Sequence, residues 1–185
     1  VNTAYCMALR NWSFRDFKYL CELQAKNGLQ LMSYYQNTHG AKTFVQSIAH
    51  VQRQETVNGI NSCRFFSVLA DGSTDRSVAE QECVYVRYVV KGVPVSKFVG
   101  LEELENANAD GVLTAINNAL GKRVGVDLDT LKNKLVNMNM DGAAVNMGKK
   151  AGVGTKQKAL VGGHVTVTHC VNHGLELAIL EPVRI

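Results

Sequence analysis

The chain has 185 residues, 46% of them hydrophobic, which is enough for one substantial core but not for two large domains. Its 20 Lys and Arg residues only slightly outnumber the 16 Asp and Glu residues, so the net charge of +4 permits a phosphate-bearing partner without requiring one. No apolar run approaches the roughly 20 residues of a membrane-spanning helix, so a membrane partner is excluded from the expected functions.

Cysteine usage and the chain ends indicate the compartment and the extent of the protein. The 5 cysteines stand singly, without a CxxC pair, and their odd number argues against the disulfide framework of a secreted domain. The first residues lack the order of a signal peptide. The chain opens without Met and stops just after an amphipathic stretch, so we expect a fragment of a longer protein from a reducing compartment.

Two helices are expected in the first third of the chain. Residues 14–26 carry apolar side chains at helical spacing, between an S-x-x-D start at Ser13 and an Asn-Gly stop. Residues 42–60 continue a looser helical pattern with a charged opposite face. Helical periodicity gives way to strand periodicity near residue 60, so we predict an N-terminal helical segment over 1–60 and a second region over 61–185.

The second region begins with strands. Residues 65–70 are apolar and rich in β-formers, which predicts a buried strand that ends in a turn at Asp71-Gly72-Ser73-Thr74-Asp75. Residues 83–90 and 95–101 form a hairpin candidate, since Lys91-Gly92-Val93-Pro94 supplies turn residues between them. The remaining expected elements are helices over 110–120 and 129–135, strands over 135–140 and 165–168, and an apolar helix over 175–180. This order predicts an α/β domain with a mixed sheet and flanking helices.

Two of the strand candidates end in Asp followed by Gly, at Asp71 and Asp141. If these two strands are parallel neighbours, with the 83–90 strand antiparallel on the other side of the first, both carboxylates lie at one edge of the sheet. Such an edge suits Mg²⁺ or Mn²⁺, and two such ions could position a water and a leaving oxygen for phosphodiester cleavage. Asp-Gly is also an ordinary turn at the end of a strand, but the pair in this order favours a metal site.

Cys170 and His173 follow the last strand about one helical turn apart, so they can face the same way. A zinc site needs about four ligands, and no second pair of suitable spacing is present, so we expect no tetrahedral zinc here. The alternative is a core cysteine with a capping or hydrogen-bonded histidine.

A basic stretch over 149–158 contains Lys149, Lys150, Lys156 and Lys158, with no acidic residue between them. We expect a flexible, glycine-containing loop that contacts a DNA backbone through charge, without reading the bases. A solvated loop with ordinary lysines is the alternative. The stretch lacks the Gly-Lys-Ser/Thr spacing of a Walker A loop.

Three segments resemble the hAT superfamily of transposases and their domesticated vertebrate relatives. Residues 65–75 resemble the first catalytic strand of the family, residues 139–147 its second, and residues 169–177 its Cys-or-Asp-x-x-His motif. The segments occur in the order of the family. Residues 14–28 and 44–60 are similar to the helical lead-in of zinc-finger-bearing, transposon-derived proteins, so the resemblance covers most of the chain.

The resemblance implies an RNase H-like domain that a large helical insertion interrupts, and an activity of DNA cleavage and strand transfer with two Asp, one Glu and a divalent metal. Asp71 and Asp141 take the places of the two Asp as catalytic metal ligands, while Cys170 and His173 shape the site. The third carboxylate lies beyond the insertion. We therefore expect a partial RNase H-like domain over 61–185, truncated before the insertion, with weak Mg²⁺ or Mn²⁺ binding and incomplete catalysis.

The resemblance also implies a nuclear, transposase-derived protein with DNA as its partner and homo-oligomerisation through the missing C-terminal region. Gly72 and Gly174 depart from the family, since many relatives carry a larger or polar residue at the first position and a basic one at the second. A domesticated, non-enzymatic module for DNA or protein interaction is the main alternative. A weaker one takes residues 71–74 as the phosphate loop of an actin-like ATPase fragment, although such enzymes need a second, duplicated domain.

Overall fold

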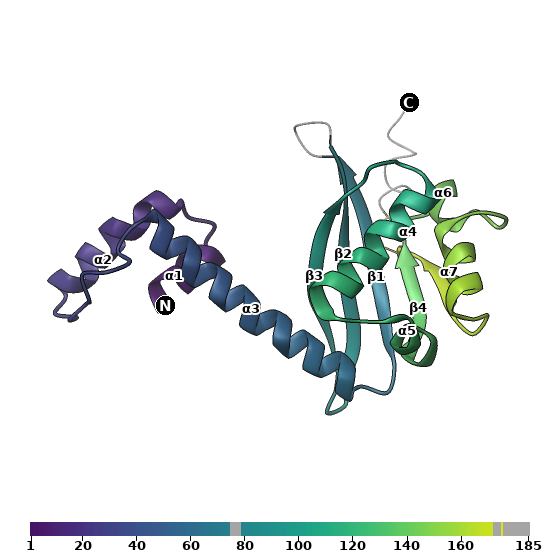
Figure 1. Cartoon of the computed structure of the whole chain (residues 1–185), viewed down its shortest axis with the longest axis horizontal. Coiled ribbons are helices and arrows are strands. Elements are labelled where there is room, and N and C mark those ends of the chain that lie inside the picture. Colours follow the sequence, from purple (N-terminus) through teal and green to yellow (C-terminus); the bar gives the residue numbers. More distant parts are fainter. Residues whose placement is uncertain (75–78, 172–174, 176–185) are drawn as a thin grey trace. The chain divides into compact units, whose positions relative to one another are not determined.

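The computed structural model describes residues 1–74, 79–171 and 175. The chain forms two compact units, Val1–Gln54 and Glu55–Ile185. Helix α3, Thr38–Ser62, runs through the boundary between them (Figure 1). The change from helical to strand period near residue 60 therefore marks the end of this helix, whereas the division into units falls earlier along it.

The first unit is helical, as expected. It contains α1 (Asn2–Leu9), the short 3₁₀ turn η1 (Phe14–Asp16), α2 (Phe17–Lys26) and the first part of α3. Ser13 caps η1 by accepting a hydrogen bond from the backbone N–H of Arg15 at 3.2 Å. The small core includes Phe17, whose ring centroid lies 6.1 Å from that of Phe44.

A five-stranded mixed sheet forms the centre of the second unit, with the order β3-β2-β1-β4-β5. The strands are β1 (Phe66–Thr74), β2 (Glu80–Val90), β3 (Val93–Glu103), β4 (Leu135–Met140) and β5 (Thr166–His169). β1 pairs in parallel with β4 and antiparallel with β2. This arrangement confirms the prediction that the two Asp-bearing strands are neighbours.

Helices pack on one face of this sheet. They are α4 (Ala109–Asn118), which continues into the π-helical turn η2 (Ala119–Arg123), α5 (Leu128–Lys134), the short α6 (Ala144–Met147) and α7 (Val153–Val161). Alternate residues of the strands face α4, which crosses the sheet in Figure 1. Val68, Val86, Met138 and Ile116 are fully buried in this layer. Each such side chain contributes about 1.5–3 kcal/mol through burial.

Side-chain hydrogen bonds connect the two parallel strands β4 and β5 on the other face of the sheet. The Asn137 side-chain amide donates to the hydroxyls of Thr166 (2.9 Å) and Thr168 (3.2 Å), and that of Asn139 donates to Thr168 at 3.0 Å. These bonds add to the backbone ladder, in which Asn137 pairs with Thr166 and Asn139 with Thr168. They fix the register of a strand that is only 4 residues long.

Two local expectations are wrong. Asp71, Gly72 and Ser73 do not form a turn, because β1 continues to Thr74 and these residues pair with β2. Residues 71–74, which the actin-like alternative assigned to a phosphate loop, therefore lie in β1. The basic stretch over 149–158 is not a flexible loop throughout, since α7 begins at Val153.

The expected helix over 175–180 lies outside the described residues, except for Leu175. In the part of the chain that the structure describes, no helix is both long and apolar enough to cross a membrane.

Gly59 in α3 provides a test of how this helix packs on β2. A Cβ added to Gly59 would lie 2.2 Å from the hydroxyl oxygen of Tyr88, a buried residue. We expect Gly59→Ala to lower the free energy of unfolding by about 1–2 kcal/mol, although alanine favours a helix over glycine by about 1 kcal/mol. Urea denaturation of the parent and the variant measures the difference.

Asn61→Ala is the matched control, because Asn61 is an exposed residue of the same helix. It should change the stability by less than about 0.5 kcal/mol. A Gly59→Ala variant as stable as the parent would show that the helix does not rest on Tyr88.

Candidate metal and phosphate site at one edge of the sheet

The register of β1 and β4 brings Asp71 and Asp141 to the same edge of the sheet. The last parallel pair is Leu69 opposite Asn139, and each Asp follows two residues later in its own strand direction. Asp71 is exposed and lies opposite Cys83 of β2, while Asp141 is half-buried just beyond the end of β4. The spacing of the sequence motifs therefore corresponds to a real juxtaposition in the sheet.

Asp141 is held in place by the segment that follows it. Its Oδ1 accepts hydrogen bonds from the backbone N–H of Ala143 at 3.0 Å and from the side-chain amide of Asn146 at 2.7 Å. Asn146 belongs to α6 and is only 9% exposed. Hydrogen bonds to a charged acceptor are stronger than neutral ones, so this carboxylate has a fixed orientation before any ligand binds.

A third acidic residue, Glu82, lies close to these two and was not among the candidates from the sequence. It occupies β2 directly opposite Gly72 and is 2% exposed. Burial, followed by the negative charges of Asp141 and Asp71, raises the pKa of Glu82 from 4.5 to about 7. The sequence does carry a signal: Glu82 stands in the alternating register of Val84 and Val86, both fully buried.

Gly72 makes room for the Glu82 carboxyl group. A Cβ on Gly72 would lie 3.3 Å from Oε2 of Glu82, closer than most side-chain contacts. The absence of a side chain at Gly72 thus has a local physical role. A larger residue here would displace the Glu82 side chain.

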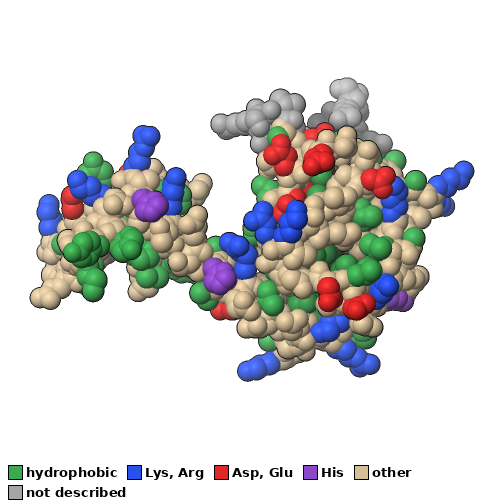
Figure 2. Space-filling model, in the orientation of Figure 1, with side chains coloured by type: hydrophobic (Ala, Val, Ile, Leu, Met, Phe, Trp, Pro, Cys, Tyr) green, Lys and Arg blue, Asp and Glu red, His purple; other side chains and the backbone are tan. Residues whose placement is uncertain are grey.

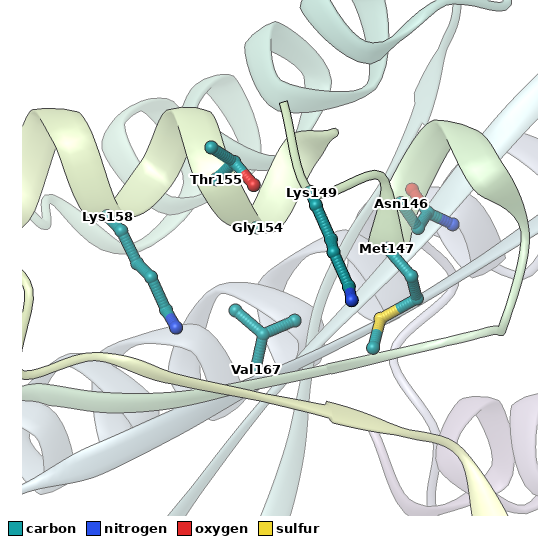
Figure 3. Close-up of a pocket in the computed structure, with 7 residues that line it drawn as sticks. All are labelled: Asn146, Met147, Lys149, Gly154, Thr155, Lys158 and Val167. Carbon is teal, nitrogen blue, oxygen red and sulfur yellow. The ribbon is translucent and has the colours of Figure 1, made fainter. Parts of the chain in front are cut away.

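A pocket of about 370 Å³ lies beside this edge and is lined by two of the four candidate lysines. Lys149 precedes α7 and Lys158 belongs to it, and Figure 3 shows both side chains extending past Val167 of β5. Asn146 lines the same pocket and also binds Asp141, so one residue connects the pocket to the carboxylate. Two ammonium groups around one hollow suit a phosphate group.

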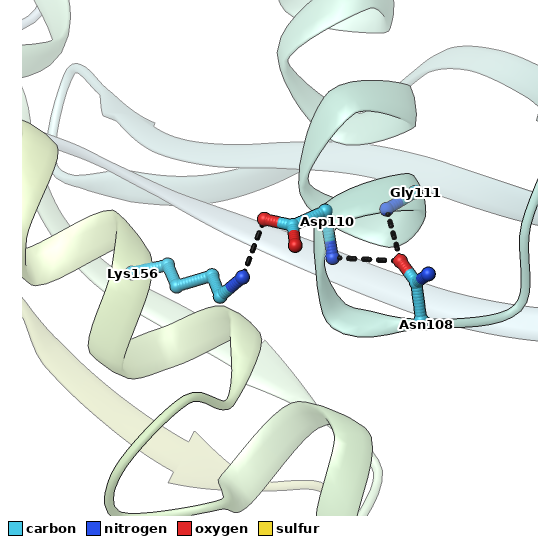
Figure 4. A network of polar contacts seen from close by, with 4 residues as sticks. All are labelled: Asn108, Asp110, Gly111 and Lys156. Atoms are coloured by element: carbon cyan, nitrogen blue, oxygen red, sulfur yellow. Dashed lines mark hydrogen bonds and ion pairs between the residues drawn. The ribbon is translucent and has the colours of Figure 1, made fainter.

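The other two lysines have different surroundings. The ammonium group of Lys156 forms an ion pair with Asp110, the first-turn acid of α4, whose N-terminus Asn108 caps (Figure 4). Its charge is therefore already paired. Lys150 is exposed in the turn before α7 and does not line the pocket.

Acidic side chains also gather on β3 at this end of the sheet, where Glu102 lies opposite Glu82 of β2, and acidic side chains are visible at the upper end of the second unit in Figure 2. A separate hollow of about 250 Å³ is lined by Glu102, Glu103, Glu105 and Asp110. This hollow would repel a polyanion, whereas the pocket at Lys149 and Lys158 would attract one.

Cys170 lies next to the end of β4, because its backbone N–H donates to the carbonyl of Met140 at 2.8 Å. It is half-buried. His173 lies outside the described residues, so its position beside Cys170 stays a prediction. His169, one residue before Cys170, packs against the Asp-Gly turn: a Cβ on Gly142 would lie 2.6 Å from its Nε2.

The chemistry of the edge is that of a hard-oxygen site. Asp71, Asp141 and Glu82 offer carboxylate oxygens, which Mg²⁺ and Mn²⁺ prefer, and one oxygen of Glu82 is buried without a hydrogen-bond partner. As they stand, no three His, Cys, Asp or Glu side chains among residues 1–74, 79–171 and 175 form a group that could hold a metal ion. An ion here would need water for the rest of its coordination shell.

The sheet order, the flanking helices and the helical lead-in define an α/β protein with part of an RNase-like domain. Residues 18–147 match the family described as ZMYM1/FAM200, RNase-like domain. The match covers well over half of the chain, so the chain belongs to this family. It spans β1 to β4, including both Asp71 and Asp141, and supports an origin from a transposase.

The raised pKa of Glu82 predicts a pH dependence of stability that Glu82→Gln should remove. The pKa of Glu82 is about 7 in the folded chain, against its usual value of 4.5. Its contribution to stability is therefore fully present below pH 4.5 and is lost as the pH rises through 7. Relative to Glu82→Gln, the metal-free parent should lose up to about 3 kcal/mol of unfolding free energy over this range. Urea denaturation at pH 5 and pH 8 with a chelator measures it.

Glu80→Gln serves as the control, since Glu80 is an exposed residue of the same strand. It should keep the pH profile of the parent. Parallel profiles for the parent and Glu82→Gln would contradict the burial of an ionisable group at this position.

Proposed function

We propose that this chain is the front part of a hAT-type, transposase-derived domain that binds DNA in the nucleus and holds Mg²⁺ or Mn²⁺ at Asp71 and Asp141. The observation that carries the proposal is the position of these two carboxylates, each two residues beyond the last parallel pair of β1 and β4, within a chain of an RNase-like family. Paired carboxylates on adjacent strands suit metal-assisted chemistry on phosphodiesters.

Different residues of the chain would bind the cation, orient its ligands and shape the surface of such a site. Asp71 and Asp141 would bind the cation, and the hydrogen bonds from Ala143 and Asn146 orient Asp141 for it. When bound, a divalent cation stabilises negative charge on a phosphate and lowers the pKa of a bound water. Cys170, next to the end of β4, would shape the neighbouring surface.

DNA binding is supported by the pocket beside the carboxylates. Lys149 and Lys158 offer two positive charges at its rim, and neither forms an ion pair with another described residue. Contacts of this kind position a DNA backbone without reading its sequence. The acidic hollow at Glu102 and Glu103 leaves the Lys149 side as the favourable approach.

A non-enzymatic module that only binds DNA is the second candidate. It is favoured by the arrangement of the acidic side chains, which provides no group of three able to hold a metal among the described residues. Such a module would keep the phosphate contacts at Lys149 and Lys158 and would not depend on Asp71. DNA binding and metal binding therefore need separate tests.

The metal site is tested by a Mn²⁺ titration followed by NMR line broadening. We expect broadening centred on the ends of β1 and β4 in the parent, with millimolar affinity because water must complete the shell. Asp71→Asn and Asp141→Asn should each abolish it, because each removes one carboxylate charge. Equal broadening in the three proteins, or broadening centred elsewhere, would reject a metal site at this edge.

The DNA interface is tested by changing Lys149 and Lys158 together to Gln. Loss of two phosphate contacts should weaken binding to a short fluorescent duplex by about tenfold at moderate salt and reduce the slope of log Kd against log salt by about two. Fluorescence anisotropy over a salt series measures both. Lys91→Gln combined with Lys132→Gln removes the same charge from other exposed positions and serves as the control. An equal loss of DNA affinity in this control would show that net charge, and not the pocket, determines binding.

A further inference from the structure

Glu82 is a buried acid without a partner in an apolar layer. Its side chain is 2% exposed, its Oε1 has no hydrogen-bond partner, and none of the ion pairs between described residues includes it. A buried carboxylate is strongly unfavourable unless a cation or hydrogen-bond donors compensate for it. Oε1 of Glu82 therefore lacks a hydrogen-bond donor among the described residues.

A second buried acceptor without a partner lies beside Asp141. Asn146 is 9% exposed; its amide nitrogen donates to Asp141, while its Oδ1 accepts no hydrogen bond. The nitrogen and the oxygen belong to one amide group, so this oxygen also lies close to the Asp141 carboxylate. Two buried oxygens in need of donors thus occur on residues that both interact with Asp141. Unpaired buried acceptors of this kind call for an ordered ligand.

The strand order explains why these groups meet. β2, β1 and β4 lie side by side, and they carry Glu82, Asp71 and Asp141 respectively. Gly72, opposite Glu82, has no side chain to separate the Glu82 carboxyl group from the edge. Glu82 faces the helices from beside Gly72, Asp71 shares the other face with Cys83, and the charges of Asp141 and Asp71 still act on Glu82 across this end of the sheet.

We propose that Glu82 is a third acidic member of the cation site at Asp71 and Asp141, which it serves by accepting hydrogen bonds from the water shell of the ion. This inference rests on the proposed function of the edge. Mg²⁺ and Mn²⁺ keep several waters when few carboxylates bind them directly, and each water donates hydrogen bonds. Glu82 is thus a positioning residue, and it supplies within this chain a third negative charge.

This role is consistent with the present side-chain positions. Because no three such side chains of the described residues close around a metal ion, Glu82 acts through water and not as a direct ligand. Groups outside the direct ligands typically change metal affinity by about 10–100-fold. Oδ1 of Asn146 offers a second acceptor for the same waters.

The test is the Mn²⁺ affinity of the full chain, measured from the electron paramagnetic resonance signal of free Mn²⁺. We expect Glu82→Gln, which keeps the shape and removes the charge, to weaken binding by about tenfold. Glu80→Gln removes the same charge from an exposed position of β2 and should stay within about twofold of the parent. Asp141→Asn is included as the variant that removes the proposed site itself.

The outcomes separate the two proposals. Parent-like affinity in Glu82→Gln, together with loss in Asp141→Asn, overturns the role of Glu82 and leaves the metal site standing. Parent-like affinity in all variants overturns both. A change in stability alone, without a change in Mn²⁺ affinity, identifies Glu82 as a buried structural acid and also overturns the inference.

Gly72→Ala gives an independent measurement if Glu82→Gln fails to fold. The added methyl group keeps the charge of Glu82 but shifts its carboxyl group by a few tenths of an ångström, since the new Cβ would lie 3.3 Å from Oε2. Mn²⁺ affinity should fall severalfold. A folded Gly72→Ala variant with the affinity of the parent overturns the inference.

Discussion

The parallel pairing of β1 with β4 is the constraint on which the rest of the second unit depends. It ends at Leu69 and Asn139, and beyond this point β1 pairs with β2 alone. The end of the shared ladder opens the sheet where two acidic side chains emerge. Every feature of the candidate site, including the Asn146 amide and the lysine-lined pocket, is built onto this opening.

Charge is distributed around this opening in a way that the net charge of +4 conceals. Asp71 and Glu82 lie on neighbouring strands and Asp141 directly follows the next one, two lysines line the neighbouring pocket, and further acids line a separate hollow. Opposite charges placed next to one another favour a ligand that carries both signs. Under the proposed function, a cation bridged to a phosphate is such a ligand.

The sequence predicted the elements whose signals are local. The strand over 135–140 appears with those limits, and both Asp residues lie at the predicted edge. The sequence did not predict the features that depend on residues far away in the chain. Asp-Gly after residue 70 resembles a turn, but antiparallel pairing with β2 extends β1 through it. The alternation of Glu82 with Val84 and Val86 signals a buried acid, but its neighbour Gly72 on β1 is visible only in the structure. The close packing of α7 on β5 is likewise non-local, since a Cβ on Gly154 would lie 2.7 Å from Cγ2 of Val167.

The two edge strands of the sheet, β3 and β5, differ in what they offer to another chain. β5 is a 4-residue strand, so it offers another chain only a short backbone edge to extend. β3 is 11 residues long, yet Pro94 removes a donor near its start and a bulge interrupts its register with β2. Short, proline-bearing or irregular edges resist edge-to-edge aggregation. The open carboxylate end can thus remain exposed without the sheet itself becoming a template for fibrils.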